Sequence, residues 1–231
     1  MIASNLRAIQ ERVTAAARAA GRDPGSVSLL AVSKTYPPEA VREAYAAGQR
    51  AFGENYAQAL RDKAQALADL PALALHAIGP LQTNKAKYIA QSAAAFHALD
   101  RLGLAQELSK RCVALGRVLP CFVEVNLGRE AQKGGVAPEG LDALVDAAAE
   151  LPGISLVGLM CIPPPTDDPQ GARPSFERLR ALRDERLGRH PSLTGLSMGM
   201  SHDFEVAIAA GATVVRVGTA IFGARARAPG T

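Results

Sequence analysis

The sequence predicts an α/β protein folded as a single (β/α)8 TIM barrel with an extra N-terminal helix. Eight short apolar runs of strand length alternate with amphipathic helical patterns along the chain. Several helical patterns end in glycine, the residue that most often follows a helix C-terminus. The predicted strands are Ser28–Lys34, Arg50–Asn55, Leu73–Gly79, Phe96–Asp100, Leu119–Asn126, Ser155–Ile162, Leu196–Met200 and Thr213–Gly218. The predicted helices between them are 38–48, 56–69, 83–94, 101–116, 138–151, 173–188 and 203–210.

An open doubly wound sheet is the alternative fold. That fold usually has fewer strands and a glycine-rich turn after its first strand, whereas residues 33–38 read SKTYPP. No linker, low-complexity tract or internal repeat divides the sequence. We therefore expect residues 1–231 to form one domain, with the N-terminal helix at 1–22 and a flexible tail at 225–231.

The N-terminal segment MIASNLRAIQERVTAAARAAG predicts an amphipathic helix with Ser4 or Asn5 as N-cap and Gly21 at its end. Its charged residues argue against a secretory signal. No stretch approaches the ~20 apolar residues that a membrane helix needs. The three cysteines have no metal-like spacing, so we expect reduced, buried thiols in a cytoplasmic protein.

Composition argues against nucleic-acid binding. The net charge of +4 is small, the basic residues are scattered, and aromatic residues make up only 4% of the chain. Single-strand binding normally needs a basic surface interleaved with aromatic side chains. We therefore expect a small-molecule ligand.

Polar side chains and glycines gather at the carboxyl ends of the predicted strands, where a barrel carries its chemistry. The first strand runs into Lys34, whose charge is costly to desolvate at the mouth of a buried strand. Either the amine snorkels to water or binds a substrate charge, or it is a nucleophile that forms a Schiff base. The second strand ends in Asn55.

The last two strands run into SMGMS and RVGT, which suit the phosphate site that barrels often build there. Gly199 and Gly218 allow the backbone to approach a ligand, and Ser201 and Thr219 add hydroxyl donors near helix starts. The alternative is that Ser201 and Thr219 are simply helix N-caps.

Arg216 interrupts the apolar run TVVRVG, and a buried guanidinium needs a partner. That partner could be a carboxylate such as Glu124, with Asn126 nearby, or a ring nitrogen of a ligand. An amine, a phosphate site and a cation facing a ring would together suit pyridoxal 5′-phosphate (PLP), with its aldehyde, phosphate and pyridine nitrogen.

Five motifs make the sequence similar to the PLP homeostasis proteins, the YggS/PROSC family of PLP-binding proteins, which is related to the N-terminal barrel of alanine racemase. The resemblance covers roughly residues 5 to 224. The motifs are LLAVSKTYP, FGENYAQ, HAIGPLQTNK, LVGLMCIPP and LSMGMSHDFEVAIAAGATVVRVGTAIFG.

The resemblance implies a fold-type III PLP barrel and a role for each candidate residue. Lys34 would form the Schiff base, Asn55 would lie beside the cofactor, and Arg216 would face the pyridine nitrogen. The phosphate cradle would comprise Ser201, Gly218 and Thr219. The resemblance also implies a cytosolic monomer that binds PLP and supplies it to other enzymes, including PLP-dependent apo-enzymes, without efficient catalysis.

Two alternative functions remain open. An amino-acid racemase of the alanine racemase type would need an acid or base on each face of the substrate carbanion. Lys34 could serve one face, and Tyr36 or Tyr56 could approach the rim, but the second domain that carries the partner tyrosine in alanine racemase is not expected. A barrel enzyme acting on a sugar phosphate would use the same loops and would be colourless.

The remaining polar residues have structural interpretations. We expect His97 and His190 to be surface or satisfied core histidines. His76 either lines the cavity or makes a structural hydrogen bond. We expect Lys133 to be an exposed loop lysine.

Overall fold

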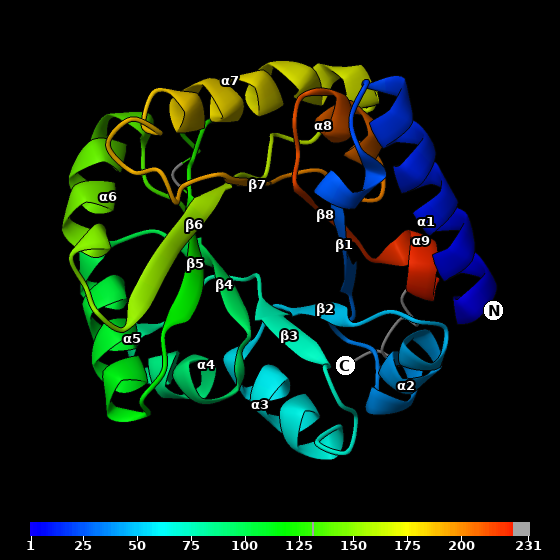
Figure 1. Cartoon of the computed structure of the whole chain (residues 1–231), viewed down its shortest axis with the longest axis horizontal. Coiled ribbons are helices and arrows are strands. Elements are labelled where there is room, and N and C mark those ends of the chain that lie inside the picture. Colours follow the sequence, from blue (N-terminus) through cyan, green and yellow to red (C-terminus); the bar gives the residue numbers. More distant parts are fainter. Residues whose placement is uncertain (131, 224–231) are drawn as a thin grey trace.

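A computed structural model describes residues 1–130 and 132–223 of the chain. Its eight strands follow one another around a closed, parallel barrel, and the hydrogen bonds between β8 and β1 close it. Figure 1 looks into this ring, with the helices outside it. The strands are β1 Ser28–Val32, β2 Ala51–Glu54, β3 Ala74–Ala77, β4 Ala95–Leu99, β5 Leu119–Glu124, β6 Ile154–Met160, β7 Gly195–Ser197 and β8 Val214–Val217.

The helices are α1 Ile2–Ala19, α2 Pro38–Ala46, α3 Ala57–Ala66, α4 Ala86–Ser92, α5 Leu102–Ala114, α6 Leu141–Ala149, α7 Arg173–Asp184, α8 Phe204–Ala209 and α9 Thr219–Phe222. Short 3-10 turns stand at η1 Pro24–Ser26, η2 Thr83–Lys85, η3 Pro138–Gly140 and η4 Pro169–Ala172. The predicted helices 83–94 and 138–151 thus each begin as a 3-10 turn. The barrel prediction is confirmed, because the eight apolar runs are the eight strands.

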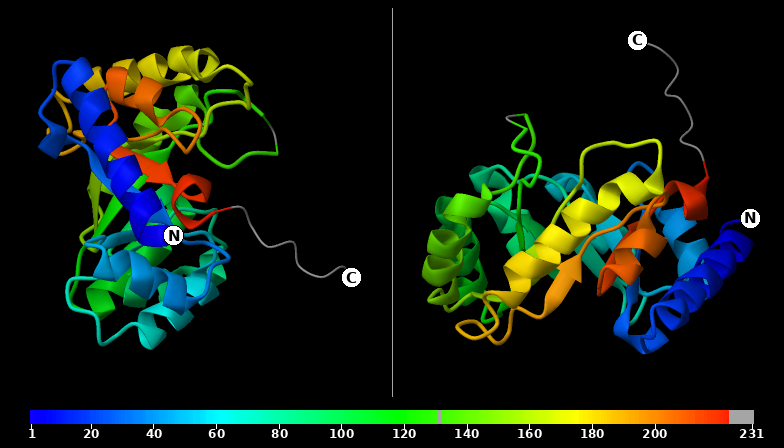
Figure 2. Two further views of the ribbon diagram at one scale, coloured as in Figure 1. Left: turned by 90° about the vertical axis from the view of Figure 1, so that its right-hand side faces the viewer. Right: turned by 90° about the horizontal axis from the view of Figure 1, so that it is seen from above.

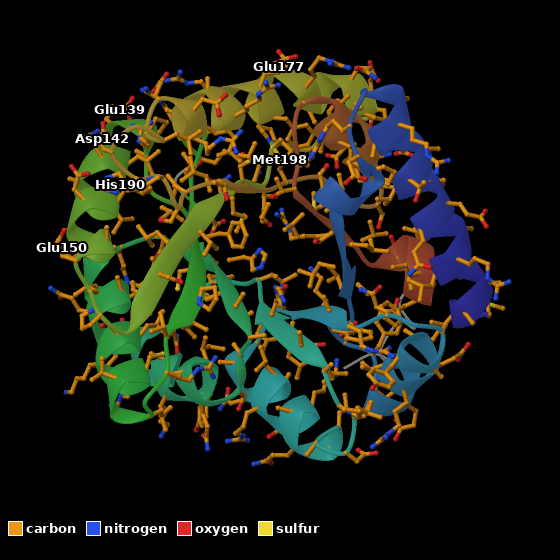
Figure 3. All side chains as sticks on the ribbon, viewed as in Figure 1. Glu139, Asp142, Glu150, Glu177, His190 and Met198 are labelled. Carbon is orange, nitrogen blue, oxygen red and sulfur yellow. The ribbon has the colours of Figure 1, made fainter. Side chains whose placement is uncertain are left out.

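The core lies between the strands and the inner faces of the helices. Its fully buried side chains include Phe52, Phe96, Phe176 and Phe204. In Figure 3, Glu139, Asp142, Glu150, Glu177 and His190 lie on or beside the outer helices, whereas Met198 lies toward the interior. The amphipathic periodicity that predicts the helices therefore also predicts which face packs on the sheet.

The extra helix α1 packs along α8 and α9 and covers the β8–β1 side of the barrel (Figure 2). The amide of Asn5 donates a 3.0 Å hydrogen bond to the carbonyl of Ile221 in α9. The N-cap prediction is wrong, since Met1 is the N-cap and Ser4 donates to the Met1 carbonyl from inside the first turn. Gly21 follows the helix with a positive φ of 67°, as expected for a C-terminal glycine.

Most strands end one to three residues before their predicted limits, because the polar residues there turn into loops. The predicted strand through Met200, for example, stops at Ser197. Within the residues described, no helix has both the length and the apolarity to cross a membrane. The predicted tail at 225–231 lies outside the described residues.

Candidate functional site

One cavity at the carboxyl ends of the strands is lined by all six predicted site residues. It has a volume of about 320 Å³, within the range typical of small-molecule sites. The predicted residues that line it are Lys34, Asn55, Ser201, Arg216, Gly218 and Thr219. Apolar walls come from Val32, Ile78, Ile162 and Met200, and a carboxyl group comes from Glu124.

Lys34 enters the cavity from a tight turn that directly follows β1. The amide of Tyr36 donates to the carbonyl of Ser33 at 3.1 Å, which closes the turn. Thr35 has a φ of 71°, a left-handed conformation that a β-branched residue adopts only under constraint. The Tyr36 hydroxyl donates to the carbonyl of Gly223 at 2.6 Å and fixes the far side of the turn.

Asn55 follows β2 and is held close to the end of β3. A Cβ on Gly79 would lie 2.5 Å from the backbone oxygen of Asn55, closer than real contacts allow. Gly79 is therefore required for the two strand ends to approach each other. This contact sets how far Asn55 reaches into the cavity.

The loops after β7 and β8 are tied together by hydrogen bonds. The amide of Arg216 donates to the carbonyl of Gly199 at 2.9 Å, and the amide of Gly218 donates to Ser201 Oγ at 3.2 Å. Gly199 has a φ of 91°, which favours glycine. The simple N-cap interpretation is wrong: the cap of α8 is Asp203, and Thr219 is the first residue of α9.

Arg216 is 5% exposed, and its guanidinium donates hydrogen bonds to Ser197 and Cys161. One terminal nitrogen of its guanidinium donates to the carbonyl of Ser197 at 2.6 Å and to Ser197 Oγ at 2.8 Å. The other donates to the carbonyl of Cys161 at 2.9 Å. The expectation that Glu124 and Asn126 anchor Arg216 is therefore wrong. Burial lowers the pKa of Arg216, although Cys161 and Glu124 oppose that shift.

Glu124 instead stands in the cavity wall as a carboxyl group that is difficult to ionise. Burial, reinforced by Asp100 and opposed by Arg216, raises the pKa of Glu124 to about 7. Asn126 closes the following loop, because its amide nitrogen donates to the Glu130 carbonyl at 2.9 Å. The prediction that Lys133 is an exposed loop lysine is wrong, because its side chain is only 29% exposed. Its ammonium group pairs with Glu130 at 2.6 Å.

The sequence interpretation missed a buried triad behind the site. Ser33 Oγ donates to Glu54 Oε1 at 2.6 Å, and Lys63 Nζ contacts the same oxygen at 2.5 Å. Lys63 also donates to the carbonyl of Ser33 at 2.7 Å. The available signal was a lysine on the apolar face of α3, one turn after the buried Leu60.

Three of the four histidines follow their structural interpretations. His97 is completely buried and hydrogen-bonded, and His76 lies against it, so the structural alternative holds for His76. His190 pairs with Asp146 at 2.6 Å on the outer surface. The three cysteines are buried free thiols, as expected.

Fold and site together define a (β/α)8 barrel with a lysine, a buried arginine and two glycine-containing loops at one mouth. A family model described as alanine racemase, N-terminal domain, matches residues 4–226. The chain belongs to this family and, within it, to the pyridoxal phosphate homeostasis proteins.

Three relatives illustrate that membership. The chain is 52% identical to the pyridoxal phosphate homeostasis protein of Pseudomonas aeruginosa over 97% of this chain and 96% of the relative. The protein of the same name from Aquifex aeolicus is 48% identical over 95% and 96%. The structure of PipY from Synechococcus elongatus with PLP bound is 37% identical, has a TM-score of 0.86, and aligns over 96% of this chain and 100% of PipY.

Proposed function

We propose that this chain binds PLP in the cavity at the barrel mouth, attached to Lys34, and that it buffers PLP and supplies it to other enzymes. The observation that carries the proposal is that one cavity gathers an amine, a buried cation and two hydroxyl-bearing loops. Relatives 48% and 52% identical are named for pyridoxal phosphate homeostasis, and the related PipY has been solved with PLP bound.

The residues present fit PLP in both space and charge. A Cβ on Gly218 would come within 3.2 Å of the Val32 carbonyl oxygen, so a larger residue would fill the loop beside Ser201. Ser201, Gly218 and Thr219 would hold the phosphate through hydroxyl and backbone N–H groups. Asn55, which follows β2, would lie beside the ring.

Bound PLP supplies an aldehyde, with which a primary amine condenses to form a C=N bond while the aldehyde oxygen leaves as water. Lys34 provides that amine. Arg216 would face the ring nitrogen as a permanent cation that does not give up a proton. A pyridine nitrogen without a proton withdraws electrons weakly, which suits storage of the cofactor better than carbanion chemistry.

Two tyrosines near the rim are poorly placed for racemisation. The Tyr36 hydroxyl already donates to the carbonyl of Gly223, and Tyr56 is 67% exposed. A racemase needs a proton donor held at the face opposite Lys34, so we propose that efficient catalysis is not the role of this chain. Its partners would be PLP and PLP-dependent apo-enzymes in the cytoplasm, and the chain would act as a monomer.

The test is an absorbance spectrum of the purified protein loaded with PLP, before and after borohydride reduction. We expect a band at roughly 420 nm that Lys34→Ala abolishes, and a pyridoxyl group fixed on the Lys34 peptide after reduction. Lys87→Ala is the matched control, because Lys87 lies exposed on α4 and contacts the Tyr88 ring. That variant should keep the band.

Two other outcomes would redirect the proposal. A protein that stays colourless with added PLP would contradict it and favour the sugar-phosphate alternative. A loaded protein that interconverts L- and D-alanine at enzymatic rates would establish the racemase alternative while leaving the cofactor assignment intact.

A further inference from the structure

A chain of buried polar groups runs from the cofactor cavity across the inside of the barrel. It begins at Arg216 on β8, whose guanidinium lies 2.8 Å from Ser197 Oγ on β7. Ser197 Oγ lies 2.8 Å from Nδ1 of His97 on β4. Nε2 of His97 then lies 2.9 Å from Nδ1 of His76 on β3. Four strands therefore contribute one residue each, and Ser197 and His97 are completely buried.

The first member favours one direction for the hydrogen bonds along the chain. A guanidinium can only donate, so Ser197 Oγ accepts from Arg216. The Ser197 hydroxyl proton is then free to point at His97 Nδ1, which accepts it. The His97 proton must in that case sit on Nε2, from which it is donated to His76 Nδ1. Ser197 and His97, the two middle groups, then each act as both acceptor and donor, an arrangement that strengthens such chains.

The surroundings favour neutral imidazoles in this chain. Burial lowers the pKa of His97 well below its usual value, with further lowering from His76 and from the positive Arg216. The ring of His97 stacks on Phe122 with centroids 4.3 Å apart, so its orientation is fixed by packing as well. A protonated His97 would have no acceptor site for Ser197 and would repel Arg216.

We propose that Ser197 and His97 are positioning residues for the cofactor, because they fix the guanidinium of Arg216 where it meets the pyridine nitrogen. His76 sets the tautomer of His97 from the far end. This inference rests on the proposed function and deepens it: the barrel interior, and not the cavity wall alone, determines how Arg216 contacts the ring.

Ser197→Ala is the direct test, since it removes Oγ but keeps the backbone carbonyl that also accepts from Arg216. Ser109→Ala is a matched control: Ser109 is a buried serine on α5 whose Oγ accepts from the Gly153 amide at 3.0 Å. Ser197→Ala loses the two buried hydrogen bonds of Oγ, with Arg216 and His97, and Ser109→Ala loses one buried hydrogen bond away from the cavity. We expect only Ser197→Ala to shift the absorbance maximum of the PLP-bound protein and to weaken PLP binding about three- to ten-fold.

Two further variants distinguish the loss of these hydrogen bonds from misfolding of Ser197→Ala. Ser197→Thr restores the hydroxyl and should return the spectrum and the affinity toward wild type. His97→Phe keeps the ring stacked on Phe122 but breaks the chain, and should reproduce the spectral change of Ser197→Ala. If all three variants match the control in spectrum and PLP affinity while wild type binds PLP, the inference is overturned and the proposed function stands.

The tautomers can be read without any cofactor. Nitrogen-15 NMR of histidine-labelled protein at pH 7 should show His97 neutral, with Nε2 protonated and Nδ1 bare, and Ser197→Ala should change the His97 signals. A proton on Nδ1, or a doubly protonated His97, would reverse the chain and overturn the inference. If the wild-type protein takes up no PLP, the proposed function fails, and this NMR result still decides the direction of the chain.

Discussion

The hydroxyl of Ser33 donates a 2.6 Å hydrogen bond to Oε1 of Glu54, and these residues immediately precede Lys34 and Asn55. Lys63 reaches from α3 to the same carboxylate oxygen. The buried triad therefore connects the end of β1, the end of β2 and helix α3. This connection lies directly before the two candidate cofactor residues Lys34 and Asn55. The positions of Lys34 and Asn55 depend on contacts that lie outside the cavity.

Removing the cation of this triad should be strongly destabilising. Lys63→Met leaves Glu54, which is 1% exposed, without its charged partner. We expect the free energy of unfolding to fall by about 3–5 kcal/mol, the usual effect of stranding a buried charge. Urea denaturation followed by circular dichroism measures this change.

The double variant Glu54→Gln/Lys63→Met separates a stranded charge from a lost contact. The free energy of unfolding of the double variant should be higher than that of Lys63→Met, because no buried ion remains in this triad. A double variant as unstable as Lys63→Met alone would mean that packing of the lysine stem, rather than its charge, stabilises this region.

Gly79→Ala should weaken PLP binding more than it changes the fold. The added Cβ would lie 2.5 Å from the Asn55 backbone oxygen, so Asn55 must move. We expect at least a several-fold rise in the PLP dissociation constant, measured by the absorbance of bound cofactor. Gly103→Ala in α5 is the control, since nothing lies within 4 Å of its added Cβ. Its substitution should leave binding unchanged and stabilise the helix slightly; equal effects of the two substitutions would count against the role of Gly79.

The gathering of the candidate residues in one cavity could be predicted because parallel strands bring their carboxyl ends to one barrel mouth. Lys34, Asn55 and Arg216 lie apart in the sequence, yet each is within two residues of the end of a strand. All three line one cavity. Alternation of strands and helices was thus sufficient to gather them. The strand ends were predicted less accurately, because backbone hydrogen bonding rather than the apolarity of the side chains determines where a strand ends.

The partners of these residues could not be predicted. Arg216 is held largely by the backbone carbonyls of Ser197 and Cys161. Because every residue has a backbone carbonyl, the sequence does not indicate which one accepts a hydrogen bond. The contact between His97 and Ser197 joins residues 100 positions apart, and it depends on strand register and side-chain rotamer. The carboxylate that sequence reasoning assigned to Arg216, Glu124, makes no hydrogen bond with it in the described part of the chain.

Acid should destabilise the protein through the buried histidines. Burial lowers the pKa of His76 from 6.5 to about 4, so the unfolded chain binds a proton between these values and the folded chain does not. The contribution of His76 is complete above pH 6.5 and is lost as the pH falls toward 4. The shift corresponds to about 3 kcal/mol.

Urea unfolding of wild type and His76→Asn at several pH values between 7 and 4 tests this contribution. The variant should be less stable at pH 7, but its stability should fall less steeply as the pH decreases. Stability curves that run parallel for the two proteins would show that His76 is not the group that titrates.

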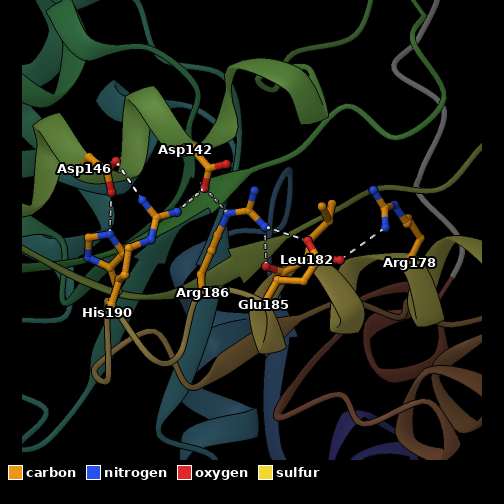
Figure 4. A network of polar contacts seen from close by, with 8 residues as sticks. Asp142, Asp146, Arg178, Leu182, Glu185, Arg186 and His190 are labelled. Carbon is orange, nitrogen blue, oxygen red and sulfur yellow. Dashed lines mark hydrogen bonds and ion pairs between the residues drawn. The ribbon is translucent and has the colours of Figure 1, made fainter.

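The ion-pair network between α6 and the turn that follows α7 should lose more stability when Asp142 is removed than when Arg186 is removed (Figure 4). The side chain of Arg186 is 6% exposed and lies 2.9 Å from Asp142, which is 52% exposed and also pairs with Arg189 at 3.0 Å. Asp142→Ala leaves the buried guanidinium without this carboxylate and should cost about 1–3 kcal/mol. Arg186→Met removes the buried charge itself and leaves Asp142 hydrated, so it should cost less.

Arg178→Met is the control for this comparison, because Arg178 and Glu185 are 3.6 Å apart and both are more than half exposed. It should change the free energy of unfolding little. All three variants should bind PLP as wild type does, because none of the three residues lines the cavity. The measurement is urea denaturation at pH 7 in low and high salt: salt should weaken the surface pair and affect the buried contact of Arg186 less. A larger loss from Arg186→Met than from Asp142→Ala would show that the packing of the arginine stem outweighs the desolvation of its charge.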